Sequence, residues 1–197
     1  VTAEDVVWSY AGVRPLYDDG ASSATAATRD YVLRVDRSAG GPVLNVFGGK
    51  ITTYRRLAES ALELVDAEFG RARAKWTAGV ALPGGDFPVD GVAQLRHELA
   101  EALPFLQAST IRRLIRQYGS EAQQIFAEAD SAEALGNDFG SGIYQRELDW
   151  AIGQEWVHEA DDFLWRRSKL GLRVSADQRQ AIEGYIAAAL SAKARVA

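Results

Sequence analysis

Apolar residues along residues 31–69 follow two successive patterns. Residues 31–35 and 43–47 are short runs rich in β-branched, aromatic and leucine side chains, and the turn sequence RSAGGP separates them. Two such runs joined by a short segment containing glycine and proline predict an antiparallel hairpin. From about residue 52 to 69 the apolar residues recur at three- and four-residue spacing, which predicts a helix. An earlier run, VVWSY at residues 6–10, also has strand composition.

From residue 90 onward the pattern is helical almost to the end of the chain. Asp90 is a candidate cap for the first of these helices, Ser120 caps a later one, and Ser175 opens the last. The expected helices span about residues 90–102, 109–118, 120–126, 144–152, 156–169 and from 175 onward.

Residues 70–88 contain two prolines and four glycines and have a linker composition, with Trp76 and Leu82 as the expected anchors. We therefore predict an α+β, mainly α chain. Residues 1–70 would form a small antiparallel β element plus one helix, residues 71–88 a linker, and residues 89–197 an all-α domain of about five or six helices.

The stretch VLNVFGGKITTYRRL, at residues 43–57, predicts a strand, a tight turn at Gly48 and Gly49, and a helix. The first turn of a helix leaves N–H groups without intrahelical partners, and the positive end of the helix dipole lies there. Such a site suits an anion or a partly negative carbonyl oxygen. Lys50 would lie at its mouth, with hydroxyls from Thr52 and Thr53. The alternative is a purely structural turn with a solvated lysine.

The composition limits the classes of function. The chain has 197 residues, of which 47% are hydrophobic and 25% charged, as in a globular protein with a sizeable core. A net charge of -5 argues against a general nucleic-acid binder but not against a local anion pocket. Without cysteine there is no disulfide, thiolate nucleophile or cysteine-ligated metal. No run approaches the ~18 apolar residues of a membrane span, and no signal peptide is visible. The absence of methionine suggests a processed or excised fragment.

The two histidines, His97 and His158, lie outside the usual metal-ligand patterns, so no metal site is predicted. Glu155 and Glu159 would lie one helical turn apart and could form a pair of carboxylates, although ion pairing with downstream arginines is favoured. The basic residues in this region are Arg166, Arg167 and Lys169. Their acidic neighbours in the sequence are Glu147, Glu155, Glu159, Asp161 and Asp162.

The run DFLWRRSKLGLR, at residues 162–173, is basic and amphipathic. Such a run can contact a membrane surface. A helix with its apolar side chains packed inward is the commoner arrangement for such a pattern.

Arg14 precedes Pro15, which favours an extended backbone at the arginine. A guanidinium group suits phosphate because its planar fork can bind two oxygens. The alternative for a lone arginine is a plain surface charge.

Four segments, in order along nearly the whole chain, resemble the C-terminal part of an FAD-dependent (aerobic-type) glycerol-3-phosphate dehydrogenase. They are SYAGVRPLYDD at residues 9–19, VFGGKITTYRRLAE at 46–59, LPGG at 82–85, and EWVHEADDFLWRRSKLGL at 155–172. The resemblance implies that residues 1–70 are the end of the flavin and substrate domain, and that the helical half is the family's C-terminal domain.

The same resemblance implies oxidation of sn-glycerol 3-phosphate to dihydroxyacetone phosphate, with FAD as the hydride acceptor and electrons passed to quinone. Arg14 is similar to the arginine that holds the substrate phosphate, and Lys50 to a catalytic lysine at the substrate and flavin. The backbone that faces the flavin pyrimidine carbonyl would be contributed by Gly48, Gly49, Lys50, Ile51 and Thr52. An oxidase of the same family, which uses oxygen, is the alternative.

The dinucleotide fingerprint G-x-G-x-x-G is absent from these 197 residues. We therefore expect that the isolated chain neither retains FAD nor has activity, and that residues 1–70 are less ordered than the helical half. Its expected partner is a missing N-terminal FAD domain. A non-catalytic role of the helical half, as a cap, a homodimer contact or a membrane-docking surface, stays open. The expected location is the cytoplasm, with peripheral contact on the inner face of the cell membrane and no nucleic acid partner.

Overall fold

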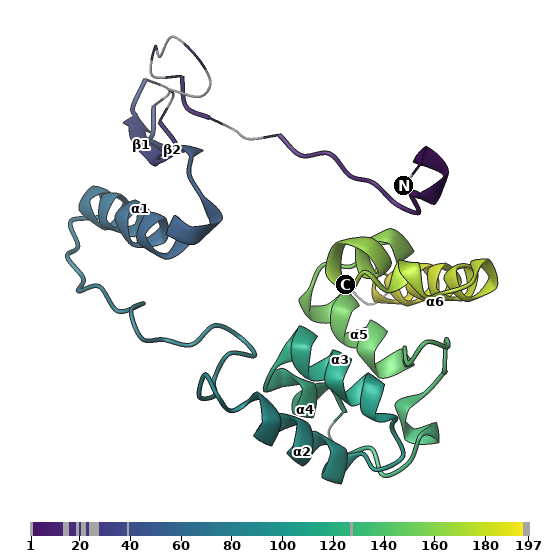
Figure 1. Ribbon diagram of the computed structural model, residues 1–197. Coiled ribbons are helices and arrows are strands. Elements are labelled where there is room, and N and C mark those ends of the chain that lie inside the picture. Colours follow the sequence, from purple (N-terminus) through teal and green to yellow (C-terminus); the bar gives the residue numbers. More distant parts are fainter. Residues whose placement is uncertain are drawn as a thin grey trace. The chain divides into compact units, whose positions relative to one another are not determined.

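The computed structural model describes residues 2–13, 16–18, 20, 23, 28–38, 40–126 and 128–194. The chain divides into two compact units, Val1–Val80 and Ala81–Ala197 (Figure 1). The boundary between the units lies inside the segment predicted as a linker. The finer bounds of 1–70, 71–88 and 89–197 stay a prediction.

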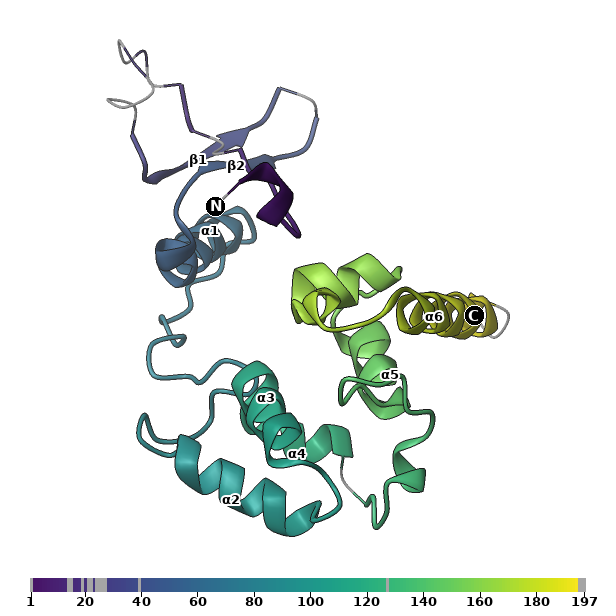
Figure 2. The ribbon, with the colours of Figure 1, turned by 45° about the vertical axis from the view of Figure 1, so that its right-hand side comes forward.

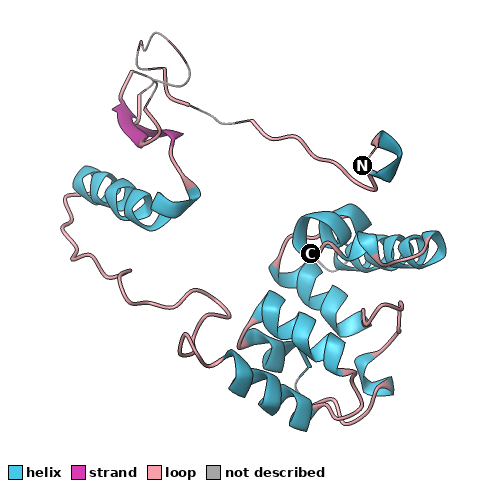
Figure 3. Cartoon of the chain, in the orientation of Figure 1, coloured by secondary structure: helices cyan, strands magenta, loops and turns pink. Residues whose placement is uncertain are grey.

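The first unit contains a two-stranded antiparallel sheet followed by one long helix (Figure 3). Strands β1 (Tyr31–Asp36) and β2 (Val43–Gly48) pair with Tyr31 opposite Gly48 and Asp36 opposite Val43, which confirms the predicted hairpin. A single 3₁₀ turn, η2 (Ile51–Thr53), then leads into α1 (Tyr54–Glu68).

The strand predicted at residues 6–10 is absent. Those residues have no strand in the structure, and a short 3₁₀ turn, η1 (Ala3–Asp5), precedes them. A strand requires a hydrogen-bonded neighbour. Among the described residues of the first unit, the sheet has only β1 and β2, so Val7 and Tyr10 are exposed.

The second unit is helical throughout its described residues, apart from turns, loops and one isolated bridge (Figure 2). Its α-helices are α2 (Val92–Ala102), α3 (Ala108–Tyr118), α4 (Glu121–Phe126), α5 (Gln145–Gln154) and α6 (Ala176–Ala194). Shorter elements are η3 (Glu133–Leu135), the π-helix η4 (Asp162–Arg167) and η5 (Leu170–Leu172). The mainly α class, with a small antiparallel β part, is therefore confirmed.

The hydrophobic core lies entirely in the second unit, as far as the described residues show. One cluster joins α2, α3 and α4 through side chains such as Leu99, Leu114 and Phe126, and a second joins α5, η4 and α6. In the first unit, the only described residues with buried side chains are the acidic Glu59 and Asp66. Burial of apolar surface is the main favourable term in folding. Most of this stabilisation therefore comes from the second unit.

Two details of the helical prediction were wrong. The N-cap of α2 is Gly91, not Asp90. The predicted helix over residues 156–169 begins only at residue 160, because the chain turns between α5 and η4. Glu155 is the C-cap of α5, and Trp156 follows it with a positive φ of 54° and an exposed side chain. Glu155 and Glu159 therefore do not lie one turn apart on a common helix.

The start of the second unit is fixed by a close backbone contact, not by the predicted anchors. Trp76 and Leu82 are 62% and 60% exposed. The Ser120 N–H group instead donates to the Gly84 carbonyl at 3.0 Å. Gly119 has a φ of +55°, and a Cβ atom there would overlap the Gly84 carbonyl oxygen. Glycine is required at position 119 because both the φ angle and the space exclude a side chain.

Replacement of Gly119 by alanine should therefore destabilise the chain by more than about 2 kcal/mol, from backbone strain and displacement of Gly84. The matched control is Gly184→Ala within α6, where a Cβ meets no atom within 4 Å. That variant should be more stable by about 0.5–1 kcal/mol. Urea unfolding followed by circular dichroism checks both, and equal midpoints for the two variants would contradict the close contact.

Candidate functional site

The predicted flavin-facing stretch forms one sharp turn between β2 and α1. Gly48 and Gly49 have positive φ angles of 65° and 100°. A Cβ atom on Gly49 would lie 3.4 Å from both Leu57 Cδ1 and Tyr31 Cβ. Two consecutive left-handed residues strongly favour glycine, because other L-residues rarely adopt this conformation. Lys50 then resumes an extended conformation and is exposed.

The turn presents backbone donors that have no acceptor among the residues the structure describes. The Lys50 N–H group donates to Thr53 Oγ1 at 3.3 Å, and the Thr53 hydroxyl donates to the Lys50 carbonyl at 3.0 Å. The N–H groups of Gly49, Ile51 and Thr52 have no such partner. Ile51 is 86% exposed, so these amides lie beside solvent. Among the described residues, the turn thus brings together three N–H groups without an acceptor and the exposed residue Lys50.

Arg14 lies outside the described residues, so the structure gives no position for it. Tyr17 belongs to the same sequence segment and is described. Its ring lies 5.6 Å from the Phe47 ring, and the Arg34 guanidinium carbon lies 5.1 Å from the Tyr17 ring centre. Tyr17 therefore contacts the end of β2, directly before the glycine turn.

Residues 73–77 run beside α1, and we call them the strap. Arg73 makes three hydrogen bonds of 2.5–3.1 Å to the Asp66 carboxylate, and Lys75 lies 3.0 Å from Glu63. The Glu59 carboxylate accepts hydrogen bonds from Arg55, at 3.1 Å, and from the Thr77 hydroxyl. The strap was not predicted, because the composition of this segment indicates a linker. A sequence signal for the strap does exist. Glu63 and Asp66 on α1 are followed by the basic residues Arg73 and Lys75, which pair with them.

His97 and Glu159 each lie beside a side chain that can carry the opposite charge. His97 is exposed, and its Nε2 lies 3.4 Å from Glu101. Glu159 lies 3.0 Å from Arg166, as the ion-pair alternative predicted. No cluster of three or more metal-ligating side chains occurs among the described residues.

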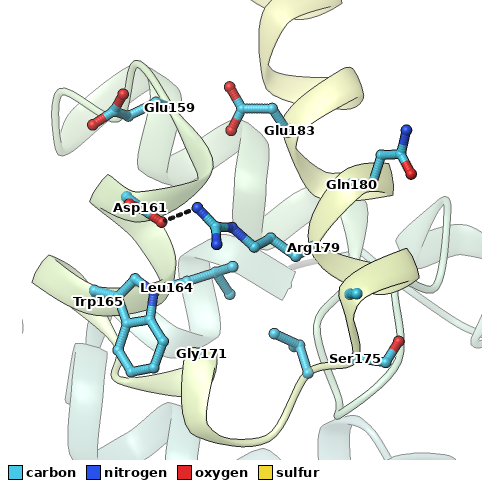
Figure 4. Close-up of a pocket in the computed structure, with 11 residues that line it drawn as sticks. Glu159, Asp161, Leu164, Trp165, Gly171, Ser175, Arg179, Gln180 and Glu183 are labelled. Carbon is cyan, nitrogen blue, oxygen red and sulfur yellow. Dashed lines mark hydrogen bonds and ion pairs between the residues drawn. The ribbon is translucent and has the colours of Figure 1, made fainter. Parts of the chain in front are cut away.

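An acidic pocket of about 630 Å³ lies between η4 and α6 (Figure 4). Arg179 crosses it to Asp161 at 2.9 Å, and Glu183 accepts the Ala160 N–H group at 2.7 Å. Two of its carboxylates are therefore already used to hold α6 against the segment before η4. The packing of these elements accounts for the pocket.

From the sequence, Glu147 was grouped with the acidic residues expected to pair with downstream basic residues, but its ion-pair partner is an arginine upstream. Glu147 is fully buried and binds Arg113 through two hydrogen bonds of 2.6 and 2.8 Å, while the Tyr118 hydroxyl donates to it at 2.9 Å. Burial, followed by the nearby Glu147 charge, raises the pKa of Tyr118. A buried carboxylate needs such partners because its desolvation costs several kcal/mol. The partner lies 34 residues away, so spacing along the chain could not identify it.

No helix in the described residues is both long and apolar enough to cross a membrane.

The fold and the turn define a class of protein. It has a helical domain, and before it in the sequence a hairpin and a helix whose connecting turn carries a lysine and N–H groups without acceptors among the described residues. Residues 75–193 match the family described as the C-terminal domain of alpha-glycerophosphate oxidase, and the chain belongs to that family.

Relatives extend the match over nearly the whole chain. The chain is 42% identical over 190 residues to the aerobic glycerol-3-phosphate dehydrogenase of Escherichia coli (strain K12), covering 94% of this chain and 37% of that protein. It is 41% identical over 187 residues to the glycerol-3-phosphate dehydrogenase of Pseudomonas aeruginosa, with 94% and 36% covered. It is 37% identical over 178 residues to the D-erythritol 1-phosphate dehydrogenase of Brucella abortus (strain 2308), with 90% and 36% covered. The chain therefore spans a little over a third of the length of these relatives.

The strap gives a pH-dependent prediction. The hydrogen bonds from Arg73 lower the pKa of Asp66 from 3.8. Because the folded-state pKa is the lower one, the stabilisation by this pair is complete above the unfolded pKa and is lost as pH falls through the folded value. Carboxyl carbon NMR should show Asp66 titrating below 3.8 in the native chain and at a higher pH in Arg73→Gln. Lys75→Gln is the control, because Lys75 pairs with Glu63 and should leave the Asp66 midpoint unchanged. An Asp66 midpoint unaffected by Arg73→Gln would exclude the pair.

Proposed function

We propose that this chain is the C-terminal part of an FAD-dependent glycerol-3-phosphate dehydrogenase. The intact enzyme oxidises the C2 alcohol of sn-glycerol 3-phosphate to the ketone of dihydroxyacetone phosphate. Two electrons and two protons leave the substrate, and the electrons pass to quinone. Membership of the family and the names of the two glycerol-3-phosphate dehydrogenases support this proposal.

The observation that carries the proposal is the turn at residues 48–52. Its unpaired N–H groups on Gly49, Ile51 and Thr52 fit a carbonyl acceptor such as the pyrimidine edge of a flavin. FAD, when bound, supplies the hydride acceptor. Aligned donors stabilise negative charge on a ring carbonyl, which is how a protein tunes such a cofactor. Gly48, with a positive φ of 65°, begins the bend that precedes these donors.

The substrate is held by two cations in this proposal. Lys50 lies between Gly49 and Ile51 in the turn, and in this proposal its ammonium group lies near the reacting alcohol. Arg14 binds the phosphate through its planar guanidinium group. Tyr17, which belongs to the same sequence segment as Arg14, contacts Phe47 directly before the turn.

The substrate class is a polyol phosphate. A relative is named for D-erythritol 1-phosphate, which shares a phosphate and neighbouring hydroxyls with glycerol 3-phosphate. A phosphate-binding arginine serves both substrates, so the length of the polyol is selected elsewhere in the site. Comparing kcat/KM for the two compounds assigns the substrate.

The description of the family as an oxidase favours oxygen as the second candidate acceptor. Oxygen consumption with peroxide formation identifies an oxidase, whereas quinone reduction without peroxide identifies the dehydrogenase. In this proposal the enzyme is cytoplasmic. It contacts the inner face of the membrane peripherally, because quinones are membrane molecules.

Two variants of the intact enzyme test the residue roles. Arg14→Ala should raise KM for glycerol 3-phosphate strongly, since loss of a charge-assisted pair to phosphate costs about 2–4 kcal/mol. Lys50→Ala should lower kcat and loosen the flavin. Arg56→Ala is the matched control, because Arg56 is exposed on α1 and lies beyond the turn. Steady-state kinetics checks all three, and an unchanged KM in Arg14→Ala refutes the phosphate assignment.

The 197-residue chain by itself should neither retain FAD nor oxidise glycerol 3-phosphate. The segment that would bind the FAD pyrophosphate, a G-x-G-x-x-G turn, is not within these residues. Absorbance spectroscopy of the purified chain checks this expectation, with the intact enzyme as the positive control. A flavin band at one equivalent per chain would overturn it.

A further inference from the structure

A basic groove of about 590 Å³ lies between α3 and the segment that follows η4. It belongs wholly to the second unit, and the proposed flavin and substrate site does not use it. Six cationic side chains line it, and no carboxylate of the described residues does. These cations are Arg112, Arg113, Arg116, Arg167, Lys169 and Arg173.

Four of the five arginines in the groove form no ion pair with a carboxylate among the described residues. The exception is Arg113, whose charge is balanced by Glu147. Arg167 donates to the Glu155 backbone carbonyl at 2.7 and 3.1 Å, which positions the guanidinium, and the Glu155 carboxylate attracts it electrostatically. The side chains of Arg112, Arg116 and Arg173 make neither an ion pair nor a hydrogen bond within the described chain. In a chain of net charge -5, this is a marked local concentration of positive charge.

The wall formed by residues 167–173 is fixed by its own packing. The Ser168 hydroxyl donates to the Phe163 carbonyl at 2.7 Å, and Leu170 is buried. Lys169 has a positive φ of 60°, a costly conformation for a lysine that the neighbouring contacts must hold. Gly171 packs so closely on the Trp165 ring that a Cβ atom there would overlap it. The groove is therefore largely preformed.

The opposite wall also contains an unsatisfied donor. Arg113 is held by Glu147 and by the Gly142 carbonyl at 2.7 Å, but its buried Nε has no hydrogen-bond partner in the described residues. Ser109 and Gln117 add neutral polar side chains along the same face of α3. Ser109 lies in the first turn of α3, where the backbone amides and the helix dipole also favour an anion.

We propose that the basic groove binds a phosphate group carried by a small soluble molecule. Guanidinium groups bind phosphate oxygens in pairs, and the volume of the groove is that of a small-ligand site. A flat lipid surface fits less well, because the groove is concave and Leu172 is the only strongly exposed apolar side chain among the described residues that line it. The proposal is independent of the dehydrogenase activity.

Isothermal titration of the 197-residue chain with inorganic pyrophosphate at low ionic strength tests the proposal. We expect saturable binding of one pyrophosphate at the groove, weakened by added salt because the charges are exposed. The double variant Arg112→Gln/Arg173→Gln removes one unpaired cation from each wall and should weaken binding by about tenfold or more, as expected for loss of charge-assisted hydrogen bonds. Absence of saturable binding, or equal binding by the double variant, overturns the proposal.

Two controls test whether pyrophosphate binds in this groove or elsewhere on the chain. Arg96→Gln removes an exposed arginine of α2 that lies outside the groove and should leave the affinity unchanged. Arg14→Ala should also leave it unchanged, and loss of binding in that variant would instead assign the pyrophosphate to the proposed substrate site. Amide shifts in NMR spectra should be confined to residues 109–117 and 167–173.

Sedimentation with vesicles distinguishes a soluble phosphate from a lipid headgroup. Phosphatidylglycerol vesicles are the probe and phosphatidylcholine vesicles the control. We expect pyrophosphate to bind the chain in the absence of vesicles and to compete with any phosphatidylglycerol binding. Sedimentation with phosphatidylglycerol that depends on Arg112 and Arg173, without pyrophosphate binding, would overturn the soluble ligand in favour of a lipid.

Discussion

The backbone reversal at Gly48 and Gly49 is the constraint on which the candidate site depends. Two successive positive φ angles end β2, and the chain enters α1 through one 3₁₀ turn. The reversal leaves the N–H groups of residues 49, 51 and 52 without acceptors among the described residues and places Lys50 between them. Unpaired donors beside a cation form a site for negative charge, whatever ligand supplies it.

The two units are stabilised by different interactions. The second unit buries two hydrophobic clusters around α2–α6, and its buried Glu147 is fully paired with Arg113 and Tyr118. The described part of the first unit buries carboxylates instead, and the strap is held to α1 by ion pairs and hydrogen bonds. Exposed ion pairs contribute little net stability. The described part of the hairpin and α1 therefore lacks the buried hydrophobic clusters that stabilise the second unit.

Positive charge is concentrated at two places that the sequence does not connect. Lys50 follows a glycine turn, where the local motif already indicates an anion or carbonyl site. The basic groove combines arginines of α3 with residues 167–173, far later in the chain. The run at 162–173 was recognised as basic, but only the packing of the second unit places it opposite another row of arginines. Within that run, the Arg167 side chain is held by the backbone carbonyl of Glu155.

The sequence by itself determined the elements whose causes are local. These are the hairpin of β1 and β2, the diglycine turn, the helices α1 to α6 to within a few residues, and the family, because periodicity, glycine conformations and ordered motifs lie within short stretches. Tertiary structure decided what depends on distant partners. Residues 6–10 lack a neighbouring strand, Glu147 pairs with an arginine 34 residues away, and Gly84 contacts Gly119 from the far side of α2 and α3 in the sequence. Composition cannot specify such contacts, because they exist only once separate segments have packed together.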